Sequence, residues 1–175
     1  FQQASDLLAK SKELDPRYAD TDLRVTEVLR LQGRTAEAVD RYVAQVQANP
    51  HALDGEIAQL ADGLRDEPDQ LRRLREAYSQ AASATPDDAA LQSYIGLMSV
   101  RLNDLPGAAT AFGRWTEIQP TSLDARRNYT LVLSETEQYA QAAGQAETLL
   151  TLAQQQGAAQ DQLSVFFQIA ALMAA

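Results

Sequence analysis

The spacing of the prolines is the feature that most constrains how this chain folds. Thirty-four residues separate Pro16 from Pro50 and again Pro86 from Pro120, and 36 residues separate Pro50 from Pro86. Between these prolines, apolar residues recur at helical spacing. A proline interrupts a helix, because it has no backbone N–H and its ring clashes with the preceding turn. A period near 34 residues therefore predicts an array of repeated helical units.

The same pattern precedes two of the prolines. An alanine is followed by an aromatic residue four positions later and by the proline eight positions beyond that. Residues four apart lie on one face of a helix, so the alanine lets a neighbouring helix approach and the aromatic ring fills the space beside it. The two occurrences are Ala38, Tyr42 and Pro50, and Ala108, Phe112 and Pro120.

Composition agrees with a wholly helical chain. Alanine is the most common residue, and no run of alternating β-branched and polar residues predicts a strand. Thr35, Asp88, Asp104 and Ser122 are residue types that cap helices and stand where helices are expected to begin. The pattern predicts helices at residues 2–14, 18–31, 35–48, 52–65, 69–84, 88–102, 105–118, 122–135, 139–154 and 160–174.

Two segments carry the fullest version of the repeat unit. One has Tyr94-Ile95-Gly96-Leu97 in its first helix, Asn103-Asp104 in the turn, and Ala108, Phe112, Trp115 and Pro120 in and after its second helix. The other has Leu29, Gly33, Ala38, Tyr42 and Pro50 in the same order. These residues resemble the tetratricopeptide repeat (TPR) family, whose unit is a pair of antiparallel helices that meet through alternating small and bulky residues. The resemblance implies an all-α, right-handed α-solenoid of antiparallel helix pairs.

The resemblance covers nearly the whole chain, which is therefore expected to be one TPR-like array. The segment 51–86 is the poorest match, because its turn contains Pro68, two residues are inserted, and the larger Leu74 takes the small-residue position. The expected division is a half repeat at 1–16, repeats at 17–50, 87–120 and 121–156, a degenerate repeat at 51–86, and a terminal or capping helix at 157–175.

Several kinds of chemistry lack the residues that they need. The chain has no cysteine and one histidine, which excludes thiolate chemistry and leaves most catalytic triads and metal sites incomplete. No glycine-rich phosphate loop is present, and the net charge of −9 provides no basic surface for nucleic acid. No apolar run reaches the roughly 18 residues of a membrane span. We therefore expect no catalytic residue, metal, cofactor, nucleic-acid partner or membrane insertion in this segment.

The remaining reactive or charged side chains have ordinary structural explanations. His51 follows Pro50 in an inter-unit turn, where an exposed or capping imidazole is expected. Arg72, Arg73 and Arg75 form the densest basic cluster, but acidic residues lie three or four positions away, which predicts an ion-paired outer helix face. Trp115 and its neighbour Phe112 stand at helical spacing beside small residues, which favours a place in the core.

A concave groove is the candidate site, because a solenoid of helix pairs lines such a groove with the first helix of each pair. The resemblance implies that peptides, extended or helical, are held by side chains projecting from these helices. Helical spacing nominates Leu23, Glu27 and Arg30 in one helix, Ser93, Leu97 and Arg101 in the next, and Arg127, Leu131 and Ser134 in a third. The family's lysine, asparagine and arginine clamp for a C-terminal carboxylate is not reproduced, so an amphipathic or mixed-charge peptide is the more compatible partner.

The last predicted helix is apolar around more of its circumference than a solvated cap should be. Such a surface marks a missing neighbouring helix, a partner surface that includes a homodimer contact, or the frayed end left by a cut. The residues of this candidate terminal interface are Phe166, Phe167, Ile169, Leu172 and Met173.

The leading hypothesis is a non-enzymatic protein-interaction scaffold that binds a peptide or partner helix in the concave groove. The bias to alanine, glutamine and arginine over lysine suggests a bacterial source. The alternative is the soluble helical arm of a larger enzyme, such as a membrane-embedded polysaccharide polymerase or ligase, and the start at Phe1 favours a longer parent protein. The compartment stays open, with the cytoplasm favoured over an extracytoplasmic location.

Overall fold

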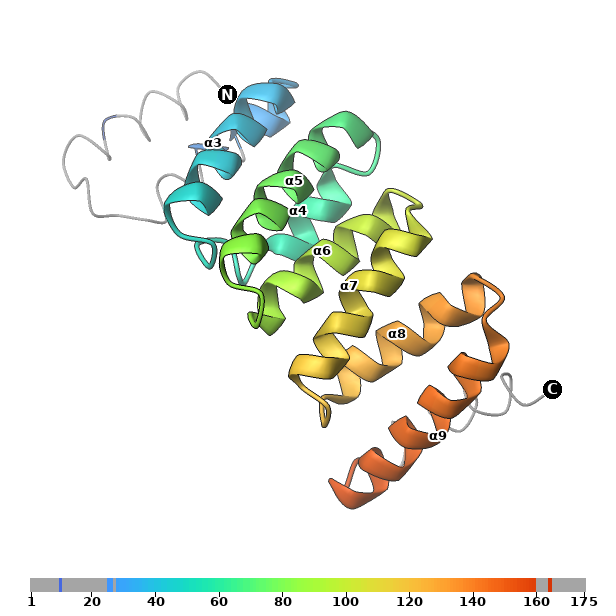
Figure 1. The fold of residues 1–175 in the computed structure, drawn as a ribbon. Coiled ribbons are helices and arrows are strands. Elements are labelled where there is room, and N and C mark those ends of the chain that lie inside the picture. Colours follow the sequence, from blue (N-terminus) through green and yellow to red (C-terminus); the bar gives the residue numbers. More distant parts are fainter. Residues whose placement is uncertain (1–9, 11–24, 27, 160–163, 165–175) are drawn as a thin grey trace.

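The protein is an array of antiparallel α-helices. The computed structural model describes residues 10, 25–26, 28–159 and 164, and these residues contain helices and turns but no strand. In Figure 1 the helices follow one another in a row from the blue end of the chain to the red end. The helices are α3 (Thr35–Ala48), α4 (Ile57–Gly63), α5 (Pro68–Ala84), α6 (Ala89–Arg101), α7 (Leu105–Ile118), α8 (Leu123–Glu135) and α9 (Tyr139–Gln155).

Three of the four predicted capping residues begin helices as expected. The Asp88 carboxylate accepts hydrogen bonds from two backbone N–H groups in the first turn of α6, at 3.0 and 3.3 Å. Asp104 and Ser122 each accept one such bond at the starts of α7 and α8. Thr35 is different, because α3 begins at Thr35 itself and the capping position is held by Arg34, whose side chain makes no capping bond.

The small and bulky residues of the strongest unit interlock as predicted. Gly96 and Ala108 are both buried, and Ala108 is fully inaccessible. A Cβ atom placed on Gly96 would lie 2.3 Å from the ring of Phe112, so only glycine leaves room for that ring. The absence of a side chain at Gly96 therefore determines how closely α6 and α7 approach.

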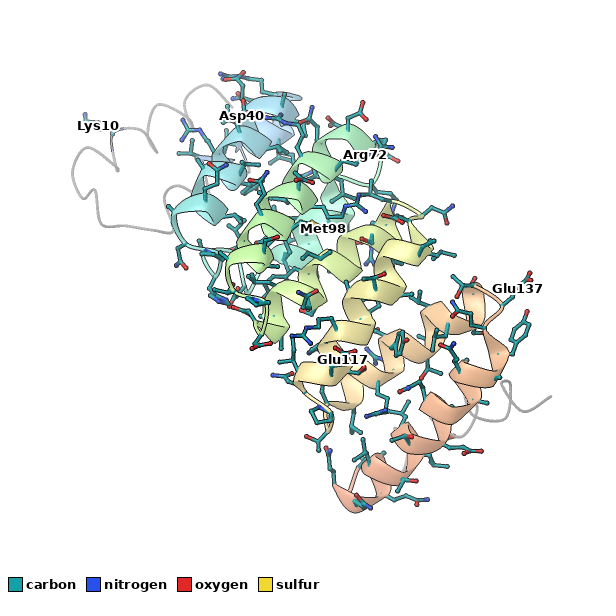
Figure 2. All side chains as sticks on the ribbon, in the orientation of Figure 1. Lys10, Asp40, Arg72, Met98, Glu117 and Glu137 are labelled. Atoms are coloured by element: carbon teal, nitrogen blue, oxygen red, sulfur yellow. The ribbon has the colours of Figure 1, made fainter. Side chains whose placement is uncertain are left out.

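The core continues along the array, with charged residues at its edges. In Figure 2, Met98 lies in the interior, whereas Asp40, Arg72 and Glu137 lie at the outer surface. Met98 is fully buried in a cluster that also contains Tyr42 and Tyr78. The Tyr78 and Tyr94 rings meet edge to face with centroids 5.4 Å apart, which joins α5 to α6.

The degenerate unit departs from the pattern of the others. The prediction of a helix over 52–65 was wrong at its start, since α4 spans Ile57–Gly63 and a series of turns precedes it. Gly55 weakens a helix there, and Leu53 instead turns its side chain into the core, where it is 1% exposed. Because α4 is short, α3 packs directly on α5, and the large Leu74 is fully buried in the core cluster that the two helices share.

The other described helices agree with their predicted ranges to within one or two residues. The segments 35–48 and 105–118 match α3 and α7 at both ends. Of the predicted helix 18–31, residues 25–26 and 28–31 are described and are helical. The predicted helices 2–14 and 160–174 lie outside the described residues, apart from Lys10 and Ser164.

Enlarging Ala108 tests the close contact between helices. Ala108→Leu should lower the free energy of unfolding by about 1–3 kcal/mol, because the added methylene groups have no space in a packed contact. Ser93→Leu is the control, since Ser93 is half-buried at an open surface, and it should change stability little. Urea unfolding followed by far-UV circular dichroism gives both values, and equal midpoints would contradict this account of the two faces.

The short helix α4 should be the part of the array that opens most easily. Seven residues form few internal hydrogen bonds, and local opening is easiest where contacts are sparse. Native-state hydrogen exchange should therefore show faster exchange in residues 51–67 than in α6. Equal protection of the two segments would refute the prediction.

Candidate functional site

An open pocket of about 320 Å³ lies between α6, α7 and α8. Its volume is at the lower end of the range for ligand pockets, and most of its accessible lining is apolar. The first helices of three successive units contribute to it, as expected of a groove on the inner side of a solenoid. The lining residues are Ile57, Ser93, Tyr94, Leu97, Val100, Arg101, Leu105, Phe112, Trp115, Asn128, Leu131, Val132 and Glu135.

The deep wall of the pocket comes from α7 and α8. Phe112 and Val132 are 4% and 5% exposed, and the ring of Phe112 lies 6.2 Å from that of Trp115. The indole N–H of Trp115 donates to the side chain of Gln119 at 3.0 Å, which holds the indole in place. The prediction of a core position is confirmed for Phe112, whereas Trp115 is partly buried against the same cluster, and both residues line the pocket.

The rim carries two leucines and a few polar groups. Leu97 is half-buried, and Leu131 is 42% exposed, which is unusual for a large apolar side chain. The guanidinium of Arg101 contacts the Asp62 carboxylate at 2.8 Å. This hydrogen bond and the positive charge of Arg101 lower the pKa of Asp62.

The structure brings four of the nominated groove residues together, namely Ser93, Leu97, Arg101 and Leu131. Arg127 does not line the pocket and lies 3.4 Å from Asp124 on its own helix. Ser134 is half-buried and also lies off the pocket.

Arg30 lies beside Gly63 of α4 instead, where its guanidinium would be 3.4 Å from a Cβ atom on that glycine. Two nominated groove residues, Leu23 and Glu27, lie outside the described residues. The candidate terminal interface of Phe166, Phe167, Ile169, Leu172 and Met173 also lies outside them.

Asn128 and Glu135 are pocket residues that the nominations did not include. They lie on α8 with Leu131, at positions i, i+3 and i+7 of one helix face. The nominations shared Leu131 but otherwise chose Arg127 and Ser134, each of which comes one residue before a pocket residue. Periodicity alone could not decide between the two faces, because polar residues occupy both.

His51 has two carboxylate partners rather than one. Its Nδ1 atom lies 3.0 Å from Asp54, three residues further along the chain, and its Nε2 atom lies 2.9 Å from Asp88 in the next inter-unit turn. Partial burial by itself lowers the pKa of His51, but the hydrogen bonds and charges of Asp54 and Asp88 outweigh it and raise that pKa above its usual value. An imidazole held between two carboxylates ties the two turns together.

The His51 contacts should make stability depend on pH. Because the pKa of His51 is higher in the folded chain than in the unfolded one, its contribution is fully present below about pH 6.5 and is lost as pH rises through the folded pKa. The free energy of unfolding should therefore fall between pH 6 and 8, and His51→Gln should weaken that fall. Parallel pH profiles for the two proteins would contradict the assignment.

The basic cluster on α5 is ion-paired, but only Arg72 pairs with an acidic residue three or four positions away, as predicted, whereas Arg73 and Arg75 pair with residues far away in the chain. Arg72 pairs with Asp69, Arg73 with Asp40 of α3, and Arg75 with Asp104 at the start of α7. These pairs join α5 to neighbouring elements and leave no arginine of the cluster without an acidic partner. Within the described ranges, no group of three acidic or histidine side chains could hold a metal ion. None of the described helices is both long and apolar enough to cross a membrane.

No protein-family model and no curated protein matches the sequence. Solved structures do match the fold. A TPR protein from Thermus thermophilus, TTC0263, is 15% identical and aligns over 96% of this chain and 89% of its own, with a TM-score of 0.61. MamA from Desulfovibrio magneticus RS-1 is 14% identical over 89% of this chain and 86% of its own, with a TM-score of 0.59. YrrB, described as a TPR protein with an unusual peptide-binding site, is 18% identical over 86% and 77%, with a TM-score of 0.52.

These similarities establish the class of fold. The chain is an all-α solenoid of the TPR type, in agreement with the resemblance seen in its sequence. Such an array stacks its helix pairs side by side, so that each unit packs mainly on its neighbours. Sequence identities of 14–18% support an inference about the fold only. Any inference about what the chain binds has to come from the pocket itself.

Proposed function

We propose that this chain is a non-enzymatic scaffold that binds a peptide or a partner helix in its concave groove, with one large apolar side chain of the partner in the pocket. The open apolar pocket between α6 and α8 is the observation that carries the proposal. Leu131 is exposed at its rim although burying it would be favourable, and exposed apolar surface next to a pocket is typical of an interaction site.

The chemistry of the described residues supports binding rather than catalysis. The single histidine of the chain is held between two carboxylates away from the pocket. The pocket's polar side chains are Ser93, Arg101, Asn128 and Glu135, and the Ser93 hydroxyl donates to the Ala90 carbonyl at 2.7 Å within its own helix. A serine hydroxyl bonded in this way, with no base beside it, is not an activated nucleophile.

The similarity to YrrB adds an independent reason to consider a peptide. That protein is described as having a peptide-binding site, and the two chains share a fold whose grooves suit extended or helical segments. The alternative, that this array is the helical arm of a larger enzyme, stays a prediction. The full open reading frame tests it, because hydrophobic spans upstream would support a membrane-embedded polymerase or ligase.

Panning a random peptide library on the whole chain tests the groove directly. Trp115 is the only tryptophan and lines the pocket, so a peptide that enters the groove should change its fluorescence. Leu131→Glu should weaken such peptides at least tenfold, because it places a charge against their apolar side chain.

Leu31→Glu is the matched control for this experiment. Leu31 is also an exposed leucine, at 53%, but it does not line the pocket, so the same substitution there should leave binding unchanged. If the library yields no binders, or if the two variants bind peptides equally well, the groove is not the binding site.

A further inference from the structure

We propose that the groove selects an extended peptide segment in which a lysine or arginine lies within about three residues of the apolar anchor, and that Glu135 is the group that recognises this cation. The inference rests on the proposed function and deepens it by naming the chemistry of the partner. Three features of the described residues support it. They are an acid without an ion-pair partner (the uncompensated acid), a base that already has such a partner (the compensated base), and a side-chain amide that makes no hydrogen bond (the open amide).

Glu135 is the uncompensated acid. It is exposed at the rim of the pocket, and among the described residues it makes no ion pair. It is also the last residue of α8. The C-terminal end of a helix carries partial negative charge from its unpaired carbonyl groups, so the helix adds to the negative potential around this carboxylate. A cation beside Glu135 would therefore be attracted by both.

Arg101, the basic residue of the pocket, is already compensated. Its guanidinium bonds to Asp62 at 2.8 Å, and Asp62 also lies 3.8 Å from Arg65, which does not line the pocket. A carboxylate of a partner would have to compete with Asp62 for this guanidinium. The pocket lining thus contains one charged side chain that already has an ion-pair partner, Arg101, and one that has none among the described residues, Glu135.

Asn128 supplies the open amide. Its side chain is half-buried in the pocket lining and makes no hydrogen bond within the part of the chain that the structure describes. An amide of this kind can donate to and accept from the backbone of an extended segment, whereas a helical segment has already paired its own backbone groups. The amide therefore favours an extended partner.

The spacing along α8 determines how far apart the recognised groups lie. Asn128 and Glu135 are seven residues apart, which is about 10 Å along a helix at 1.5 Å per residue. An extended peptide covers that distance in about three residues at 3.3 Å each. The peptide backbone would lie at Asn128 and its apolar anchor beside Leu131. A basic residue up to three positions from that anchor would then reach Glu135.

The charge of the whole chain acts in the same direction. Its net charge of −9 attracts cationic peptides over longer distances. That general attraction has no preferred position in the peptide, whereas recognition by Glu135 does. A test must therefore separate the local carboxylate from the overall field.

The test uses the peptides recovered by panning the random library on the wild-type chain. We expect recovered sequences to contain lysine or arginine within three residues of a large apolar residue. Glu135→Gln should weaken these peptides about two- to fivefold, as expected of one exposed ion pair. Panning on Glu135→Lys should remove the preference for basic residues at that position.

Glu137→Gln is the control for overall charge. Glu137 is exposed two residues beyond Glu135 and does not line the pocket, so this variant changes the net charge equally and should leave affinity unchanged. Circular dichroism of each variant verifies that the fold is intact.

The outcomes separate this proposal from the proposed function. Peptides that require Leu131 but lack a basic residue near the anchor, or that bind Glu135→Gln as well as wild type, would overturn the recognition of a cation and leave the groove as a binding site. Equal weakening by Glu135→Gln and Glu137→Gln would also overturn it, because the overall field would then account for the effect. A library that yields no binders would overturn both proposals.

Discussion

The approach of Phe112 to Gly96 is the contact on which the rest of the structure depends. Because Gly96 has no side chain, the aromatic ring sits against the backbone of α6 and joins α6 to α7. The same ring, with Trp115 beside it, forms the deep wall of the pocket. The contact between Phe112 and Gly96 therefore holds α6 against α7 and also shapes the pocket. A change that separates the two helices would reshape the groove as well.

Charged residues at the described surface mostly compensate one another. Arg73 pairs with an aspartate on another helix, and Arg75 joins α5 to the start of α7. These exposed pairs add little stability individually, but they involve most of the described arginines. Glu135 stands out because it faces the pocket and has no ion-pair partner among the described residues. Recognition by a repeat array thus depends on which charges its own contacts leave unused.

The degenerate unit shows how a repeat can lose its regularity without breaking the array. With α4 reduced to seven residues, α3 and α5 meet directly, and Leu74 fills the space that a small residue would leave open. His51 joins the turn before α4 to the turn before α6 through Asp54 and Asp88. A larger side chain and a polar bridge therefore take over contacts that a full-length first helix makes elsewhere.

The sequence by itself determined the helical class, the period and most helix bounds, because proline spacing, capping residues and small-to-large patterns act within one or two turns of chain. It also indicated Leu97 and Leu131 as groove residues. Only the tertiary structure decided that α4 is short, that His51 reaches Asp88, and that Asn128 and Glu135 face the pocket. Those outcomes depend on the rotation of each helix against its neighbours, which is set by contacts between residues far apart in the chain rather than by local periodicity.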